Sequence, residues 1–208
     1  MKILLTGGNS DLAKHIAATL CRFDVYQVSA PKRAELDVTS QKSVENYFLG
    51  NSFDVVVNCA GSLYSSRIVD SEPALWINDI QTNLIGTYLV SRMALIKNNR
   101  CRIVNISSTA AFNAYKDWTA YCAAKAGVIK LTMGLAKDGY DTLALCPGAI
   151  DTKLRDGLSI NNSNVMTIEE GIRPIINAIT TQQYKSGDIV FYRKGILELN
   201  PDFVIDNK

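Results

Sequence analysis

The chain has 208 residues, of which 47% are hydrophobic and 20% charged, and its formal net charge is +2. This is the composition of an ordinary globular protein with one good core, so we expect a single domain spanning 1–208. No run of Lys or Arg is longer than two residues, and no apolar segment approaches the length of a membrane span. We therefore expect a cytoplasmic protein that binds neither nucleic acid nor membrane.

The five cysteines lack the spacing of a disulfide framework or a zinc site. They are Cys21, Cys59, Cys101, Cys122 and Cys146, without any C-x-x-C pair, and His15 is the only histidine. We expect buried, reduced thiols and no metal. His15 falls within the first predicted helix, where we expect a surface or packing role.

Short apolar runs alternate with segments of helical period along the chain. The predicted strands are Lys2–Leu5, Val25–Val28, Phe53–Asn58, Arg102–Ile106, Thr142–Cys146 and Asp188–Tyr192. The predicted helices span 11–22, 40–49, 73–98, 118–137 and 167–181. Such alternation indicates an α/β fold, a doubly wound parallel sheet of the Rossmann-like type with helices on both faces.

Two segments depart from this alternation. Only a few residues separate the second predicted strand from AELDVTS (34–40), too few for a full crossover helix. We therefore expect the helix between strands 2 and 3 to be missing. The stretch KLRDGLSINNSNVM (153–166) is interpreted as a long polar loop and a candidate lid over a substrate.

The first predicted strand leads into TGGNSDLA (6–13), a glycine turn followed by a helix start. Such a turn lets backbone N–H groups approach the pyrophosphate of a dinucleotide and directs a positive helix end at it. Asp11, however, puts a carboxylate where that anion should lie. The turn could be a working site, a decayed one or an ordinary strand-to-helix connection. We favour a working site, with Asp11 directed outward or capping the helix at its edge.

In an open parallel sheet, ligands bind at the carboxyl ends of the strands. The segment ISS (106–108) follows the fourth predicted strand, and YCAAK (121–125) lies in the next predicted helix. Tyr121 and Lys125 are four residues apart and so fall on one helix face. An ammonium beside a phenol lowers the pKa of the phenol, which makes Tyr121 a candidate proton donor and acceptor.

Taken together, the motifs resemble the compact branch of the short-chain dehydrogenases/reductases over about residues 1–195. They are TGGNSDLA, LDV (36–38), NCAG (58–61), QTNLIGTYLV (81–90), the ISS and YCAAK segments, and CPGAIDT (146–152). The chain departs from the family pattern in the glycine turn, where Asp11 and Ala13 stand at the second and third glycine positions.

The resemblance implies an oxidoreductase that transfers a hydride between a nicotinamide cofactor and a carbonyl or alcohol substrate. Tyr121 would then move the proton at the substrate oxygen, and Ser108 would hold that oxygen. Lys125 would lower the pKa of Tyr121 and bind the nicotinamide ribose. Asn83, in a helix whose local bend could free a carbonyl, would support a water linked to Lys125. Ser107 points the other way on its strand, and we expect it to be structural.

The resemblance also implies where the cofactor binds. The residues concerned are Gly7, Asn9, Ser10, Asp11, Leu12, Lys32, Arg33, Asp37, Val38, Asn58, Ala60, Gly61, Tyr121, Lys125, Pro147, Gly148, Ile150 and Thr152. After the second strand no carboxylate occupies the place that grips the ribose of NAD, and Lys32 and Arg33 follow. Because the planar fork of Arg33 suits a phosphate, we expect NADP(H), with NAD(H) as the alternative.

The substrate and the branch of the family stay open at this point. Candidate substrate-pocket residues are Ser62, Leu63, Tyr64, Thr109, Tyr115, Trp118 and the 153–166 loop. One alternative is a sugar-nucleotide epimerase or reductase of the extended branch, which needs a larger region after Thr152. Another is a non-catalytic NAD(P)-sensing regulator, which would have lost catalytic side chains that this chain retains. The resemblance further implies a homodimer or homotetramer packed through the helices at 73–98 and 118–137.

Overall fold

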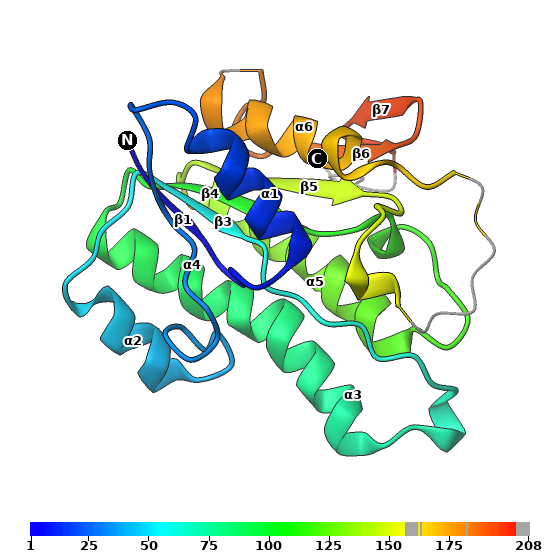
Figure 1. Ribbon diagram of the computed structural model, residues 1–208. Helices are drawn as coiled ribbons and strands as arrows, with labels where there is room; N and C mark the ends of the chain where they lie inside the picture. Colours follow the sequence, from blue (N-terminus) through cyan, green and yellow to red (C-terminus); the bar gives the residue numbers. More distant parts are fainter. Residues whose placement is uncertain (157–161, 163, 182, 203–208) are drawn as a thin grey trace.

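The computed structural model describes residues 1–156, 162, 164–181 and 183–202. Within them, one seven-stranded sheet has the order β2-β1-β3-β4-β5-β6-β7 (Figure 1). The strands are β1 (Lys2–Leu5), β2 (Gln27–Ser29), β3 (Val55–Asn58), β4 (Arg102–Ile106), β5 (Thr142–Pro147), β6 (Ile189–Arg193) and β7 (Ile196–Leu199). Strands β1 to β6 are parallel, and β7 pairs antiparallel with β6.

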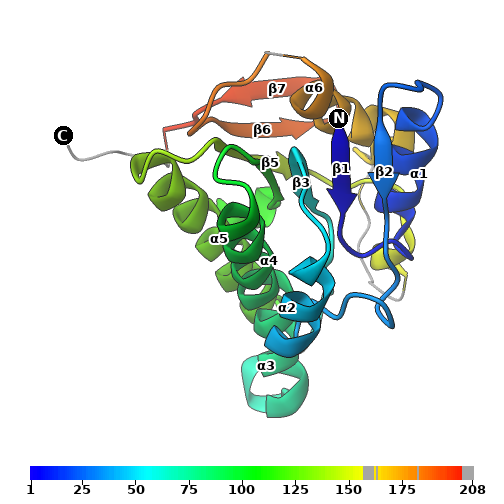
Figure 2. The same ribbon diagram turned by 90° about the vertical axis from the view of Figure 1, so that its left-hand side faces the viewer.

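Helices cover both faces of the sheet. They are α1 (Asp11–Leu20), α2 (Gln41–Leu49), α3 (Pro73–Ile80), α4 (Gly86–Lys97), α5 (Thr119–Lys137) and α6 (Ile168–Thr180). Helices α1 and α6 pack on one face, and α2, α4 and α5 pack on the other (Figure 2). The predicted doubly wound α/β fold is confirmed. Among the described residues, none of the helices combines the length and the apolar character that a membrane crossing needs.

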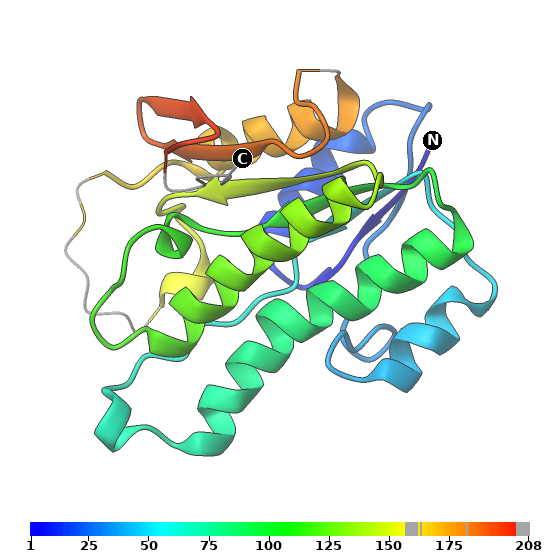
Figure 3. The ribbon, with the colours of Figure 1, turned by 180° about the vertical axis from the view of Figure 1, so that it is seen from behind.

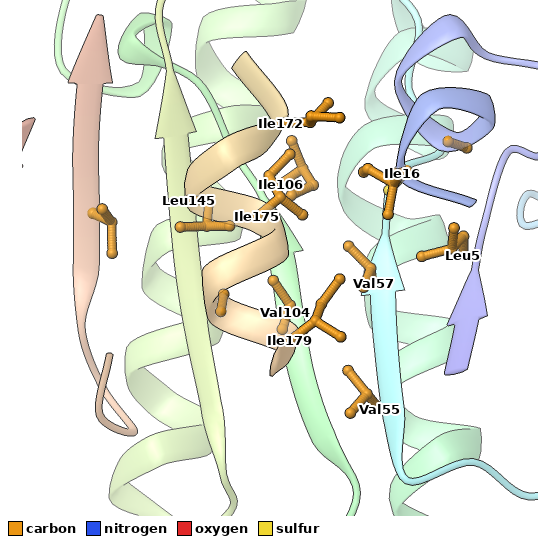
Figure 4. Packing of buried hydrophobic residues seen from close by; sticks show 14 of the residues in the cluster. Leu5, Ile16, Val55, Val57, Val104, Ile106, Leu145, Ile172, Ile175 and Ile179 are labelled. Atoms are coloured by element: carbon orange, nitrogen blue, oxygen red, sulfur yellow. The ribbon is translucent and has the colours of Figure 1, made fainter. Parts of the chain in front are cut away.

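The core forms in two layers because successive side chains of a strand point to opposite faces of the sheet. In β4, Val104 and Ile106 pack toward α1 and α6, whereas Ile103 packs toward α2 and α4. Figure 4 shows Ile175 of α6 among the side chains of the strands beneath it, with Leu145 of β5 close by. Burial on both faces explains why the inner strands are continuous apolar runs in the sequence.

The predicted helix at 73–98 forms as α3 and α4, joined by a π-helical turn at Gln81–Ile85. The ribbon runs through this turn without a break (Figure 3). Pro73 begins α3, where its missing N–H costs no hydrogen bond. Asn83 lies in the middle of the π-helical turn, so the expected local irregularity at this residue takes that form.

The connection from β2 to β3 corrects one prediction. No helix forms between β2 and AELDVTS, and residues 30–40 consist of turns and irregular chain. Helix α2 follows this segment, where the helical period at 40–49 indicates one, so the expectation that the helix between strands 2 and 3 is missing is wrong. The side chain of Asp37 explains this. It accepts hydrogen bonds from Thr39 N at 3.0 Å and Thr39 Oγ1 at 2.7 Å, which turns the chain toward the N-cap of α2 at Ser40.

The sequence pattern does not predict β7. All four residues of this strand are exposed, so they lack the alternation that marks a half-buried strand. The strand pairs with β6 through a two-residue connection, Lys194 and Gly195. A glycine directly after an apolar run is the signal that could have indicated this hairpin.

Candidate active site

A cleft of about 980 Å³ lies at the carboxyl ends of the strands, among residues that follow β1, β3, β4 and β5. The sheet order reverses between β1 and β3, which is where folds of this class bind ligands. The predicted site residues that line this cleft are Asn9, Ser10, Asp11, Leu12, Gly61, Asn83, Ser108, Tyr121, Lys125, Pro147, Gly148, Ile150 and Thr152. Segments far apart in the sequence are thus brought to one place.

Other predicted cofactor residues do not line the cleft. They are Gly7, Lys32, Arg33, Asp37, Val38, Asn58 and Ala60. The Asn58 side chain turns into the interior, where its amide donates to Ser91 Oγ at 3.0 Å and to Asn105 Oδ1 at 2.8 Å. It ties β3 to β4 and α4. Val38 is buried in the core beneath α2 and α4.

Two glycines shape the turn after β1. Gly7 has φ +69°, and a Cβ there would lie 2.8 Å from Ala60 Cα. A Cβ on Gly8 would overlap the carbonyl oxygen of Ala30. The turn is therefore held closely against the residues that follow β2 and β3. It leads into α1, whose first-turn N–H groups have no intrahelical acceptor.

The carboxylate of Asp11 reaches the segment after β5. Its Oδ2 accepts a hydrogen bond from the main-chain N–H of Lys153 at 2.8 Å. The N-cap of α1 is Ser10, whose Oγ accepts from Ala13 N at 3.2 Å. Of the two orientations expected for Asp11, capping is excluded because Ser10 takes that position, and the carboxylate turns away from the helix to bridge the two segments.

Tyr121 and Lys125 lie on one face of α5, as their spacing predicts. Lys125 Nζ is 5.4 Å from the centroid of the Tyr121 ring and donates to Ile106 O at 3.0 Å. Tyr121 is 7% exposed and Lys125 is 5% exposed. The Ser107 hydroxyl donates to Lys125 O at 2.8 Å, but Ser107 also lines the cleft, so a purely structural role for it stays a prediction.

Burial dominates the protonation of this pair. It raises the pKa of Tyr121 to about 12, while a side-chain hydrogen bond with Ser108 lowers that pKa and the charge of Asp79 raises it further. Burial outweighs the lowering expected from Lys125, so the prediction that the pKa of Tyr121 falls toward neutral pH is wrong for this structure. The ammonium lies over the ring, and a buried phenolate is poorly solvated. Burial also lowers the pKa of Lys125 to about 8.

Asn83 is fully buried in the π-helical turn. Its Nδ2 donates to Ser62 O and to Asp79 O, both at 2.9 Å. Its main-chain carbonyl accepts from Thr87 Oγ1 at 2.8 Å. Within the described part of the chain, the side-chain Oδ1 has no hydrogen-bond partner. The π-helical turn thus places a buried amide with a free acceptor at the cleft.

Aromatic side chains border the cleft next to Tyr121. The Trp118 ring meets the Tyr121 ring edge to face at a centroid distance of 5.9 Å, and Tyr115 lies 5.2 Å from Trp118. Leu63 and Thr109 also line the cleft, as predicted. These rings give the pocket an apolar wall beside the candidate proton donor.

Two predicted pocket residues face elsewhere. The Ser62 hydroxyl donates to Asp79 Oδ1, and the Tyr64 hydroxyl accepts from Glu72 N. In the 153–166 loop, the cleft-lining residues are Lys153, Leu154, Arg155 and Asn162. The lid prediction for positions 157–161 and 163 lies outside the described residues.

Sequence reasoning missed several residues of this region. Cys59, within NCAG, lines the cleft, as do Ser65, Lys116 and Asp117. Asp79 is 1% exposed and contacts Asn83 without lining the cleft. The sequence signal that could have indicated Asp79 is an acidic residue one helical turn before Asn83, on the same helix face.

Comparison with known proteins identifies the family. The family model described as short chain dehydrogenase matches residues 1–163. A protein of Staphylococcus aureus (strain MRSA252), named an uncharacterized oxidoreductase, is 27% identical over 192 residues, covering 88% of this chain and 82% of that protein.

Solved structures share the fold. A small-chain dehydrogenase in complex with NADPH superposes with a TM-score of 0.83 at 19% identity, covering 94% of this chain and 97% of that one. A 4-hydroxyisoleucine dehydrogenase complexed with NADH gives a TM-score of 0.79 at 21% identity, with 91% and 95% covered.

The fold and the cleft define an α/β protein with a Tyr-Lys pair beside a glycine turn. The chain belongs to the short-chain dehydrogenase family. It is an oxidoreductase of this NAD(P)-dependent class, and the resemblance seen in its motifs is confirmed.

Proposed function

We propose that the protein is an NADP(H)-dependent oxidoreductase that transfers a hydride between the nicotinamide and a carbonyl or alcohol substrate, with Tyr121 as proton donor and acceptor. One observation carries the proposal. Ser108, Tyr121 and Lys125 line the same cleft as the glycine turn and the start of α1. The candidate proton donor and the candidate dinucleotide site would therefore share one space.

The residues of the cleft fit a dinucleotide. The first turn of α1 offers N–H groups and a positive helix end to a pyrophosphate. A Cβ on Gly61 would lie 3.0 Å from Asn83 Oδ1 and 3.8 Å from Lys125 Nζ, so glycine keeps this side of Lys125 open. Pro147, Gly148, Ile150 and Thr152 would border the nicotinamide end. When bound, the cofactor supplies the hydride.

The protein's own residues would manage the proton. With its pKa raised to about 12, Tyr121 holds its proton at neutral pH and can donate it to a carbonyl oxygen during reduction. Ser108, hydrogen-bonded to Tyr121, would hold that oxygen next to the phenol. The Lys125 ammonium would stabilise the phenolate that forms. Trp118 and Tyr115 would shield the reacting oxygen from water.

The choice of NADP(H) over NAD(H) rests on Arg33 and Lys32. The Arg33 side chain is 71% exposed and pairs with Asp37 at 3.3 Å. Such surface pairs are weak, so the guanidinium is free to turn to a 2′-phosphate. Glu35 accepts from Lys32 N at 2.8 Å, which brings a carboxylate to this turn. Glu35 and Asp37 thus equal Lys32 and Arg33 in number, so the preference rests on the planar fork of Arg33 rather than on net charge.

Replacing Arg33 by alanine should weaken NADPH binding by about tenfold, roughly 1.4 kcal/mol, and leave NADH binding nearly unchanged. Arg22→Ala removes another exposed arginine, at the far end of α1, and is the matched control. Calorimetry with both cofactors measures the effect. Equal affinity of the wild-type protein for NADPH and NADH would contradict the preference.

The function itself is tested with purified protein, NADPH and a panel of aldehydes and ketones. We expect NADPH to be consumed in the presence of at least some of these carbonyls. Tight NADPH binding without consumption across a broad panel would favour a cofactor-sensing regulator instead.

We also propose that the protein is a homodimer or homotetramer. Leu75 and Ile77 of α3 and Tyr88 and Ile96 of α4 expose large apolar side chains. A second copy packed on these helices would cover them. Light scattering that shows a strict monomer would contradict this. A cytoplasmic location stays a prediction, to be checked by cell fractionation.

A further inference from the structure

A buried carboxylate lies behind Asn83, and no motif of the sequence assigns it a role. Asp79 belongs to α3 and is 1% exposed. The Ser62 hydroxyl donates to Asp79 Oδ1 at 2.5 Å, and Asn83 Nδ2 donates to the same oxygen at 3.1 Å. Asp79 Oδ2 has no hydrogen-bond partner within the part of the chain that the structure describes. A buried acid with an unpaired oxygen is costly, so its position calls for a function.

The contacts of Asp79 fix the direction of the Asn83 amide. Asn83 Nδ2 faces Ser62 O, Asp79 O and Asp79 Oδ1, all of which are acceptors. Turning the amide over would set its oxygen against these acceptors, so one orientation is favoured. Asn83 Oδ1 then faces Gly61, on the side where Lys125 Nζ also lies.

Lys125 has donors to spare on that side. An ammonium has three N–H donors, and Ile106 O accepts from Lys125 Nζ at 3.0 Å. The main-chain carbonyl of Asn83 already accepts from Thr87. The buried side-chain oxygen of Asn83, which lacks a partner among the described residues, is thus the acceptor turned toward the lysine.

The charges around Lys125 single out the same acid. The groups that face Lys125 are Asp79 from α3, Cys59 after β3, Cys146 of β5 and Tyr121 of α5. Burial raises the pKa of both thiols and of Tyr121 to about 12, so these groups are uncharged where Lys125 titrates, near pH 8. Of the described acids facing Lys125, Asp79 is then the anion.

The neighbours of Asp79 shift its pKa in opposite directions. Burial raises the pKa of Asp79. Donors from Ser62, the Tyr64 backbone and Asn83, together with the Lys125 charge, lower it. The carboxylate and the ammonium therefore favour each other's charged form across the Asn83 amide.

We propose that Asp79 is a positioning residue of the active site, which holds the Asn83 amide with its oxygen toward Lys125 and supports the Lys125 ammonium with its negative charge. The proposal rests on the proposed function of Tyr121 and Lys125. Asp79 acts through these neighbours, since its side chain does not line the cleft.

Two substitutions separate the two parts of this role. Asp79→Asn keeps an oxygen for Asn83 and Ser62 but removes the charge. Asp79→Ala removes both. Asp70→Asn, at an exposed carboxylate shortly before α3, is the matched control for loss of one negative charge.

The first measurement needs neither cofactor nor substrate. The ¹⁵N chemical shift of the Lys125 ammonium is followed through a pH titration, with Lys125→Met to assign the signal. Asp79→Asn should lower the pH at which Lys125 titrates by about one unit, because the opposing charge is lost. Asp70→Asn should leave it unchanged. An unshifted titration in folded Asp79→Asn overturns the proposal, whatever the enzyme's activity.

The second measurement is the pH profile of kcat for carbonyl reduction. Asp79 raises the pKa of both Tyr121 and Lys125, so without its charge the pair loses its first proton at lower pH. The basic limb of the profile should shift to lower pH in both variants. Asp79→Asn should largely retain the wild-type kcat. Asp79→Ala should have a kcat about tenfold lower than Asp79→Asn, because the Asn83 amide is released.

Equal kcat in the two folded variants overturns the orienting part of the proposal. If Asp79→Ala does not fold, Asp79→Asn still decides the charge part by its titration and profile. A wild-type protein that reduces no carbonyl refutes the proposed function, and the Lys125 titration then remains as the separate test of the contact between Asp79 and Lys125.

Discussion

Asp11 stands where the glycine turn of this chain departs most from its family. Its carboxylate holds the Lys153 N–H at 2.8 Å, so a negative charge sits at the edge of the cleft, beside the first turn of α1. The same charge that ties two segments together also repels a pyrophosphate. Asp11 therefore supports the shape of the cleft through its hydrogen bond and opposes cofactor binding through its charge.

Asp11→Asn keeps an oxygen for the Lys153 N–H and removes the charge. We expect it to tighten NADPH binding, by no more than about tenfold or roughly 1.4 kcal/mol. The gain should be largest at low salt, where repulsion is least screened. Calorimetry at two salt concentrations measures it, with Asp11→Ala as the variant that also loses the hydrogen bond. Binding by Asp11→Asn but not by wild type would mean that the turn is a decayed site.

Local spacing explains which site residues the sequence predicts. Tyr121 and Lys125 share a helix face, and Ser108 follows a strand, so short-range geometry brings them to the cleft. The contact between Asp79 and Asn83 depends on the π-helical turn, and residue spacing alone does not indicate that turn. The pKa of Tyr121 depends on burial by residues from several elements, so the sequence predicted a lowered pKa where the structure raises it.

At the scale of elements, α6 secures the larger core against the sheet. It begins with a capping box, in which Thr167 Oγ1 accepts from Glu170 N and Glu170 Oε2 accepts from Thr167 N. Ile175 is fully buried on its inner face, over the strands (Figure 4). The next residue, Ile176, is only half-buried.

Ile175→Ala should lower the free energy of unfolding by about 2–5 kcal/mol, because it leaves a cavity between α6 and the sheet. Ile176→Ala, with the same change of side chain at a half-buried position, should cost clearly less. Urea denaturation of both variants measures the difference. Equal losses would show that the core between α6 and the sheet is not packed as described.

The pattern of burial also explains which elements the sequence predicts. The inner strands and the helices have buried faces, and periodicity detects these. In AELDVTS, Leu36 and Val38 are buried and alternate like a strand, but the hydrogen bonds of Asp37 to Thr39 turn the chain instead. Strand β7 has no buried residue, so its pairing depends on β6 rather than on its own pattern.

At the scale of the whole molecule, the topology of the sheet assembles the site. Asp11 and Lys153 are 142 positions apart and meet because β1 and β5 end at the same edge of the sheet. The alternation of strands and helices predicts this edge as the ligand site. The loops after each strand decide which side chains meet at this edge, and the sequence pattern does not predict the course of these loops.

The reaction proposed for this cleft is hydride transfer from NADPH to a carbonyl, with Tyr121 supplying the proton. The most direct test uses NADPH deuterated at the transferred position of the nicotinamide, with mass spectrometry of the alcohol product. We predict that the wild-type product carries the deuterium, and that Tyr121→Phe still binds NADPH but forms product about 10²–10⁴ times more slowly. A product without deuterium, or a Tyr121→Phe protein with the wild-type rate, would contradict the claim.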